Sequence, residues 1–341
     1  MYVRPVPERI CGLYSEGLEN AQASRPVISH VGAASAAPRA KAGYVSRTMI
    51  VSASYRTDIP ALYGEWFLNR LVAGHALVAN PYGGKPYHVS LRAGDVDGFV
   101  LWTRNIGPLA DRLSEVAAVA PFTVQFTATG YPRALEPGVI DRDAATEQIH
   151  SLARAWGPRA VVWRYDPVVD TDLTDPAWHR RNFAAMAATL EGAVDEAVIS
   201  FAQIYAKTRR NLDAAARTHG FSWRDPEDGE KRALAGELAT IAAAHGMRLT
   251  VCSQPDYAVG GAEPARCIDA ARLSDIAGHE IAARIKGNRP GCLCHESRDI
   301  GAYDSCPQGC AYCYAVSSRD AAKRFLAAHD PAGEGLGPIP S

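Results

Sequence analysis

Three cysteines near the carboxyl end of the chain have the spacing of metal ligands. Cys306, Cys310 and Cys313 fall within eight residues of a sequence that is otherwise poor in cysteine. Thiolates at these spacings can hold three corners of a cuboidal iron–sulfur cluster and leave its fourth iron open to a small ligand. Gly309 allows a tight turn before the second cysteine, and Pro307 stiffens the entrance of the loop. The motif therefore predicts a metal site and is compatible with a [4Fe-4S] cluster.

Two other interpretations of these three cysteines remain open. A structural zinc site normally takes four protein ligands, and Cys292, Cys294 or His295 is available as the fourth. The other is a set of unrelated buried thiols, which so dense a group of cysteines disfavours.

Four further cysteines allow a second metal site, formed by Cys252, Cys267, Cys292 and Cys294. Four thiolates suit either a second [4Fe-4S] cluster or zinc. In the alternative interpretation, Cys252 is a core residue and the Cys292–Cys294 pair assists the first site. A measurement of iron, sulfide and zinc per chain distinguishes these cases. Cys11 lies far from the other cysteines and is assigned no role.

The segments that position these residues alternate between strands and helices. One helix is expected to begin at Asp175-Pro176, an N-cap followed by proline at the first helical position. Nearly continuous apolar strands indicate a parallel sheet covered on both faces. The expected strands are 49–54, 76–79, 99–102, 122–127, 160–164, 197–201 and 247–251, with a short eighth near 267–268. This alternation predicts an α/β protein, a TIM-like (β/α) barrel that is closed or nearly closed. An open doubly wound sheet is the alternative.

The chain is expected to divide into four parts. Residues 1–47 are rich in Ala, Pro, Arg and Ser and predict a disordered or loosely packed leader. The barrel is expected at 48–290. A cysteine-rich iron–sulfur segment with a C-terminal helix, both packed on the barrel, is expected at 291–328. The tail at 329–341 is rich in Gly and Pro and is predicted to be disordered.

Polar side chains gather where the predicted strands end, which in a barrel is the position of the active site. The candidates for catalysis are Arg56, Asp58, Arg104, Gln125, Arg164, Asp166 and Lys207, and Thr103 and Asn105 are candidates for cofactor binding. Several guanidinium groups at one mouth suit an anionic or zwitterionic ligand, because their geometry matches carboxylate and phosphate. The pairs Arg56–Asp58 and Arg164–Asp166 also have a structural interpretation, as salt bridges at strand ends.

Composition and charge disfavour several classes of protein. The 341 residues carry a net charge of −1, so no global basic field points to nucleic acid or to an anionic membrane. No run of 18 apolar residues is present, so no segment is expected to span a bilayer. Seven of the eight cysteines fall after residue 250, and the chain begins without a signal-peptide pattern. These features predict a cytoplasmic protein with metal-binding cysteines rather than disulfides.

The cysteine loop resembles the Cys-x3-Cys-x2-Cys motif of radical S-adenosylmethionine (radical SAM) enzymes, in which an aromatic residue such as Tyr312 usually precedes the third cysteine. Those enzymes carry the loop after the first strand, whereas here it lies near the end of the chain. That order resembles an uncharacterised bacterial family, catalogued as a domain of unknown function, whose C-terminal cysteines are similar to the radical SAM cluster. The resemblance covers about residues 52–315 and rests on Ser54–Pro60, Asn80-Pro81, Trp102–Asn105, Gln125–Thr127, Trp163–Pro167, Ile199–Phe201 and Asp299–Tyr303.

This resemblance implies an enzyme in which the open iron binds S-adenosylmethionine and Tyr312 belongs to the cofactor site. A donor such as a flavodoxin or ferredoxin would supply the electron that cleaves the cofactor to a deoxyadenosyl radical, which abstracts hydrogen from a substrate. The protein's part is to hold and shield the cofactor that carries this chemistry. The sequence does not specify the substrate.

Two other functions are compatible with the sequence. The first is a nucleic-acid or nucleotide-processing β/α barrel with a structural metal site, in which basic side chains contact phosphates. Those side chains would be Arg56, Arg104, Arg164, Lys207, Arg209 and Arg210. The second is a non-catalytic electron carrier, which the size of the barrel disfavours, because holding a cluster needs far less chain.

Overall fold

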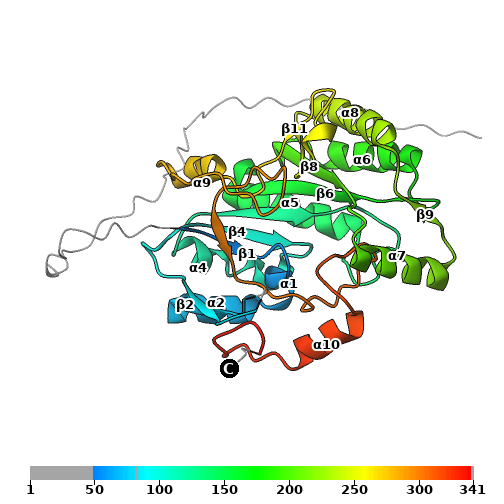
Figure 1. Ribbon diagram of the computed structural model, residues 1–341. Coiled ribbons are helices and arrows are strands. Elements are labelled where there is room, and N and C mark those ends of the chain that lie inside the picture. The colour runs from blue at the N-terminus through cyan, green and yellow to red at the C-terminus, as the bar shows by residue number, and fades with distance from the viewer. Residues whose placement is uncertain (1–48, 81–82, 339–341) are drawn as a thin grey trace, which may run out of the picture. The chain divides into compact units, whose positions relative to one another are not determined.

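The computed structural model describes residues 49–80 and 83–338. The predicted leader at 1–47 lies outside them, as does the last part of the predicted tail, 339–341. In the part of the chain that is described, eight parallel strands form one sheet in the order β11-β10-β8-β6-β5-β4-β1-β12 (Figure 1). They are β1 (Met49–Ala53), β4 (Val96–Thr103), β5 (Phe122–Thr127), β6 (Val161–Val168), β8 (Glu196–Phe201), β10 (Arg248–Val251), β11 (Glu263–Pro264) and β12 (Ser297–Asp299).

Helices connect these strands, as the alternating pattern predicted. They are α1 (Ile59–Leu62), α2 (Gly64–Ala73), α3 (Gly107–Ala110), α4 (Leu113–Ala117), α5 (Arg142–Trp156), α6 (Pro176–Leu190), α7 (Ala206–His219), α8 (Asp228–Ala244), α9 (Ala270–Ala277) and α10 (Arg319–Ala327). The start of α6 is confirmed, because the Asp175 side chain accepts a hydrogen bond from the amide of Trp178 at 2.6 Å. None of the described helices has the length and apolar character needed to cross a bilayer.

One predicted sheet strand belongs elsewhere. The segment expected at 76–79 forms β2 (His75–Val78), which pairs antiparallel with β3 (Tyr87–Ser90) outside the main sheet. A second small hairpin joins β7 (Asp170–Thr171) to β9 (Trp223–Arg224). A four-residue apolar run does not reveal its partner, so the prediction that this segment is a strand of the parallel sheet was wrong.

The sheet follows the order of the chain from β1 to β11, and the last strand, β12, returns to the free side of β1. The strands β11 and β12 are therefore its two edges. Within the described ranges no ladder joins these edges, so the predicted closed barrel is not found. The segments that flank them are linked by the amide of His295, which donates to the carbonyl of Ile268 at 3.0 Å. The strand β12 also lies beyond residue 290, where the barrel was expected to end.

The two faces of the sheet carry different side chains. Outward residues such as Phe99 and Trp163 pack with α2, α5, α6 and α8 in the main core. On the inner face, apolar residues at the strand starts pack with α9, among them Ile50, Val100, Val162 and Val198. Two residues further along each strand, the same face becomes polar or aromatic, at Ser52, Trp102, Arg164 and Ser200. Because side chains alternate along a strand, this pattern concentrates polar groups at the carboxyl ends of the inner face.

The predicted disordered tail is ordered up to residue 338. Trp66 Nε1 on α2 donates to the carbonyl of Gly333 at 3.0 Å, and Arg70 Nη2 donates to that of Ala332 at 3.0 Å. Leu336 is buried in the main core. Side chains on α2 thus donate hydrogen bonds to the backbone carbonyls of this Gly- and Pro-rich segment and hold it in place. Composition alone does not reveal these contacts.

Candidate functional site

A cavity of about 650 Å³ opens at the carboxyl ends of the parallel strands. Most residues predicted for catalysis or cofactor binding line it: Arg56, Asp58, Thr103, Arg104, Arg164, Asp166, Lys207 and Tyr312. The seven cysteines of the described ranges line it too, namely Cys252, Cys267, Cys292, Cys294, Cys306, Cys310 and Cys313. The strand ends and the cysteine-rich segment therefore meet in one place.

The three-cysteine loop, residues 306–313, has no regular secondary structure and is held by its neighbours. The side chain of Asn211 on α7 donates to the carbonyl of Cys313 at 3.1 Å. Gly309 adopts a φ of 82°, and a Cβ there would lie 2.8 Å from Nε of Arg319. Both the left-handed conformation and the close approach require glycine at this turn.

Asp58 follows β1 and connects the three-cysteine loop to the end of β4. Its Oδ1 accepts from Thr103 Oγ1 at 2.7 Å and from the amide of Ala61 at 3.1 Å. Its Oδ2 accepts from the amide of Arg104 at 2.9 Å and from Gln308 Nε2 at 2.8 Å. Burial raises the pKa of Asp58, and these hydrogen bonds oppose the rise. With both oxygens engaged, Asp58 positions the loop rather than a ligand.

Arg104 and Tyr312 share a buried carboxylate, Glu136. Arg104 Nη1 donates to Glu136 Oε1 at 2.8 Å, and Thr129 Oγ1 donates to the same oxygen at 2.7 Å. The hydroxyl of Tyr312 hydrogen-bonds to both Arg104 and Glu136. This network fixes the aromatic residue that precedes the third cysteine of the loop.

Arg56 is paired with Asp299, the last residue of β12, rather than with Asp58. Its Nε and Nη2 donate to Asp299 Oδ1 at 3.0 and 2.8 Å, and both side chains are buried. Ser52 and Ser54 donate to the same carboxylate at 2.9 and 2.6 Å. These contacts hold β12, and the loop that follows it, against the end of β1.

Arg164 belongs to β6, and its side chain lies in the cavity wall. It pairs with Asp166, which agrees with the structural interpretation of these two residues, and its Nη1 donates to Gln125 Oε1 at 3.1 Å and to Cys267 Sγ at 3.0 Å. Its guanidinium stands 5.0 Å from the centre of the Trp102 ring, a cation–π contact. Gln125 is fully enclosed behind Arg164 and does not line the cavity.

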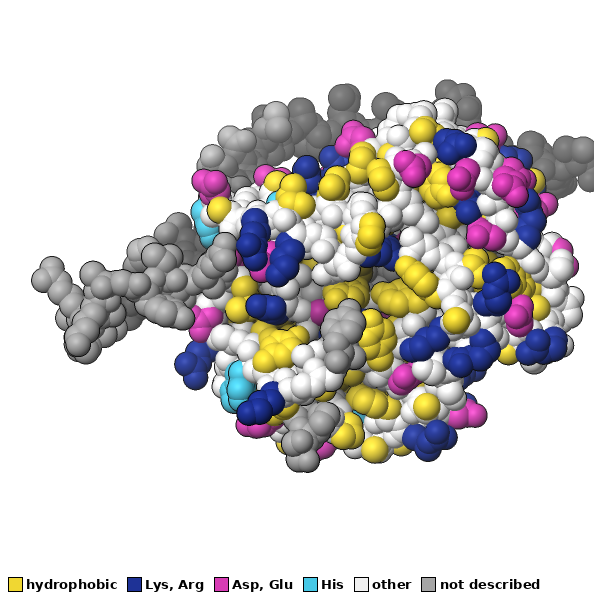
Figure 2. All heavy atoms as spheres, in the orientation of Figure 1, with side chains coloured by type: hydrophobic (Ala, Val, Ile, Leu, Met, Phe, Trp, Pro, Cys, Tyr) yellow, Lys and Arg dark blue, Asp and Glu magenta, His cyan; other side chains and the backbone are white. Residues whose placement is uncertain are grey.

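The other predicted residues are divided between the cavity and its surroundings. Lys207, at the start of α7, lines the cavity and lies 5.5 Å from the centre of the Tyr303 ring. Figure 2 shows Lys and Arg side chains gathered over α7. Asn105 lies outside the cavity, where its Oδ1 accepts from the amide of Gly107 at 3.0 Å and from Gln148 Nε2 at 2.8 Å.

Several residues of the site were not predicted. Glu136 follows β5 in an irregular segment, and no pattern distinguished it. Arg289 and Thr208 line the cavity without following a strand directly. Gln308 had one signal, its position inside the cysteine motif. Thr208 Oγ1 and Gln308 Oε1 are buried without a hydrogen-bond partner, so two polar atoms beside the cavity are unsatisfied.

The cysteines of the loop are partly buried, so they can ionise to thiolates and bind metal only if a positive charge compensates them. Burial raises the pKa of Cys310 to about 12 and also raises the pKa values of Cys306 and Cys313. Metal ligation requires deprotonated cysteine, and the core of an iron–sulfur cluster provides the compensating charge. In residues 49–80 and 83–338, no three His, Cys, Asp or Glu side chains are placed to hold a single metal ion. A cuboidal cluster makes a different demand, because each thiolate binds a different iron.

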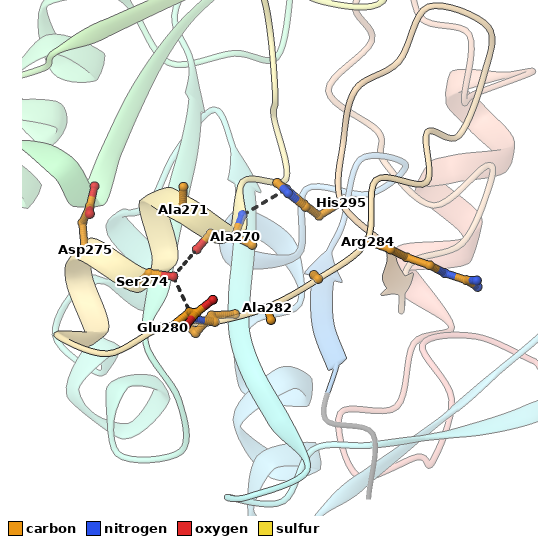
Figure 3. A pocket seen from close by; sticks show the side chains of 10 residues that line it. Ala270, Ala271, Ser274, Asp275, Glu280, Ala282, Arg284 and His295 are labelled. Carbon is orange, nitrogen blue, oxygen red and sulfur yellow. Dashed lines mark hydrogen bonds between the residues drawn. The ribbon is translucent and has the colours of Figure 1, made fainter. Parts of the chain in front are cut away.

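A second hollow lies beside α9 (Figure 3). Ser274 Oγ donates to the carbonyl of Ala270 at 2.7 Å and accepts from the amide of Ile281 at 2.9 Å. His295 Nδ1 accepts from the amide of Ala270 at 3.1 Å. These polar groups stabilise the ends of the helix and its neighbouring segment, so we assign no ligand to this hollow.

The fold and the site define an α/β protein whose parallel sheet carries a cysteine-lined cavity at its carboxyl edge. A family model described as a domain of unknown function (DUF1848) matches residues 50–315. This match covers most of the chain, so the protein belongs to that family, and the predicted membership of a domain-of-unknown-function family is confirmed. No curated protein and no solved structure matches the chain.

Proposed function

We propose that this protein is an iron–sulfur enzyme of the radical SAM type, with a [4Fe-4S] cluster on Cys306, Cys310 and Cys313. The observation that carries the proposal is that the three thiols share one cavity with the charged and aromatic side chains of the strand ends. When bound, such a cluster passes one electron from a donor such as a flavodoxin or ferredoxin to S-adenosylmethionine, which divides into methionine and a 5′-deoxyadenosyl radical.

The position of the loop in space supports this proposal despite its position in the sequence. Radical SAM enzymes resemble this chain in their cysteine spacing but carry the loop after the first strand. Here β12 pairs with β1, so the segment after β12 lies against the segment after β1. Thr57 Oγ1 is 2.7 Å from Ser305 Oγ, and Asp58 accepts from Gln308. A loop at the end of the chain thus reaches the same end of the sheet as a loop after the first strand.

The unsatisfied polar atoms beside the cavity suit the amino-acid part of S-adenosylmethionine. Gln308 Oε1 is an acceptor that matches an ammonium group, and Thr208 Oγ1 both donates and accepts. Lys207, adjacent to Thr208 and in the cavity wall, provides a cation for the carboxylate. In this proposal Asp58, Arg104 and Arg56 act as positioning residues that hold the loop and β12.

We further propose that the sheet is a β/α barrel with one open seam, between β11 and β12. Its strands follow the chain around to β1, as in a barrel, and the hydrogen bond from His295 to Ile268 spans the seam. All seven cysteines of the described ranges are free thiols, which supports a reducing location such as the cytoplasm.

The alternative, a nucleic-acid or nucleotide-processing barrel, has less support. Arg56, Arg104 and Arg164 are each paired with a buried or partly buried carboxylate, so their charges are already compensated. The exposed cations Arg209 and Arg210 on α7 remain available to phosphates. Purified protein containing zinc and no iron would favour this alternative.

Electron paramagnetic resonance tests cofactor binding at the open iron. The protein, purified and reconstituted without oxygen and then reduced with dithionite, is expected to change its cluster spectrum when S-adenosylmethionine is added. Cys310→Ala is expected to lose that change, because the three-thiolate site is incomplete. A reduced cluster whose spectrum is identical with and without S-adenosylmethionine contradicts the proposal.

A further inference from the structure

Four other thiols line the same cavity and contact one another in a row. Cys252 follows β10, Cys267 follows β11, and Cys292 and Cys294 precede β12. Sγ of Cys267 lies 3.4 Å from Sγ of Cys252. The side chain of Cys294 interacts with those of Cys267 and Cys292. Three separate segments thus bring the four thiols to the wall of one cavity.

Two guanidinium groups donate to this row of sulfur atoms. Arg164 Nη1 is 3.0 Å from Cys267 Sγ, and Arg289 Nη2 is 3.6 Å from Cys252 Sγ. A guanidinium is always charged and only donates, and a neutral thiol is a weak acceptor. Hydrogen bonds to ionised acceptors are roughly twice as strong as those between neutral groups. These two cations therefore offset part of the negative charge that the sulfur atoms would carry as thiolates.

The loop that carries Cys292 is folded by two glycines. A Cβ on Gly287 would lie 2.1 Å from the carbonyl oxygen of Cys292, and Gly291 has a φ of 73° with Ser253 directly against it. No other residue fits either position. The chain from Gly287 to Cys294 is thus shaped to turn back and bring both cysteines to the cavity.

We propose that Cys252, Cys267, Cys292 and Cys294 are the ligands of a second iron–sulfur cluster, which faces the same cavity as the three-cysteine loop. Four thiolates complete the ligand set of a [4Fe-4S] cluster, so this centre has no open iron. It therefore suits electron transfer rather than the binding of S-adenosylmethionine. The inference goes beyond the function proposed above and does not depend on it.

Two other fates of these thiols agree less well with the structure. A zinc ion needs four donors that converge tetrahedrally on one point, whereas in the described part of the chain no three such donors are placed to hold one ion. Disulfides would leave Arg164 and Arg289 donating hydrogen bonds to neutral sulfur atoms, which are weak acceptors. A cluster spreads its four thiolates over four irons, and Arg164 and Arg289 then donate to its sulfur atoms. Hydrogen bonds of this kind tune the potential of such clusters.

Metal content in matched variants tests the proposal. The full-length chain is reconstituted without oxygen using ferrous iron and sulfide, and iron, sulfide and zinc are counted per chain. Two four-iron clusters give about eight irons. The triple variant Cys306→Ala/Cys310→Ala/Cys313→Ala is expected to keep about half of the iron, together with a cluster absorption band. Cys267→Ala/Cys294→Ala is expected to keep about the other half, and Cys11→Ala to keep all of it.

The outcomes separate this inference from the first cluster. A folded triple variant without iron, or with zinc in its place, would overturn the second cluster whatever the first one does. Iron retained by the triple variant supports it even if the protein never cleaves S-adenosylmethionine. Circular dichroism establishes that each variant is folded. If a variant is unfolded, the wild-type count decides alone, because about four irons per chain contradicts two clusters.

Discussion

The substitution Gly138→Ala tests whether the three-cysteine loop is held in place by its packing. Gly138 lies in the segment after β5, and a Cβ there would be 2.5 Å from the carbonyl oxygen of Gln308 and 3.0 Å from its Cα. No positive φ restricts Gly138, so its own backbone tolerates alanine. The strain falls instead on the loop, between Cys306 and Cys310.

The size of the effect follows from these distances. Carbon–oxygen contacts in proteins are normally at about 3.3 Å or more, so the backbone at Gln308 must move by roughly 0.8 Å. Overpacking of this kind typically costs about 1–3 kcal/mol. No thiol is removed and no group in the cavity wall is replaced. A loss of iron would therefore report the displacement of the loop itself.

Urea unfolding and iron counts after reconstitution measure the two consequences. We expect Gly138→Ala to unfold at lower urea concentration and to lose up to about half of the iron, because the loop holds one of two proposed clusters. Gly229→Ala is the matched control, since a Cβ at that position in α8 meets no atom within 4 Å. Wild-type stability and iron content in Gly138→Ala would show that packing against Gly138 does not hold the loop in place.

Two further predictions concern stability. Asp299→Asn removes the negative charge that pairs with buried Arg56 and is expected to cost about 3–5 kcal/mol in the free energy of unfolding, measured with urea. A loss below about 1 kcal/mol would contradict the role given to this pair. Burial lowers the pKa of His179 to about 4, against about 6.5 in the unfolded chain. The neutral imidazole is thus favoured by folding, and this stability is complete above pH 6.5 and is lost as the pH falls toward 4. The loss is on the order of 3 kcal/mol, and the difference in unfolding free energy between wild type and His179→Gln should shrink by that amount over this range. A constant difference would show that His179 does not titrate as described.

Most elements could be predicted because their signals are local. The strand expected at 122–127 is β5, and the Asp175-Pro176 cap begins α6 as predicted. By contrast, β12 is only three residues long and includes Arg298 and Asp299, so no apolar run marks it. Its existence depends on Arg56 and the serines of β1, which lie more than 240 positions away. Partners so distant leave no trace in the pattern of one segment.

Site residues at the ends of strands could be predicted from the sequence. Site residues that only tertiary contacts bring to the cavity were missed. Barrel active sites lie at the carboxyl ends of the strands. From this rule we expected Arg56, Arg104 and Arg164 to share one site, and all three line the same cavity. The rule did not reveal that each has a carboxylate partner, because Glu136 sits in an irregular segment that only the fold brings near. Unlike Trp66 and Trp163, which lie in the main core, Trp102 lies in the cavity wall, because it faces the opposite side of its strand from the outer core residue Leu101.

Cleavage of S-adenosylmethionine tests the proposed radical SAM function directly. Reconstituted protein is incubated without oxygen with dithionite and S-adenosylmethionine, and 5′-deoxyadenosine and methionine are quantified by liquid chromatography with mass spectrometry. Both products are expected to form with wild-type protein and to be absent with Cys310→Ala. A protein that carries its full iron and yet releases neither product would contradict that function.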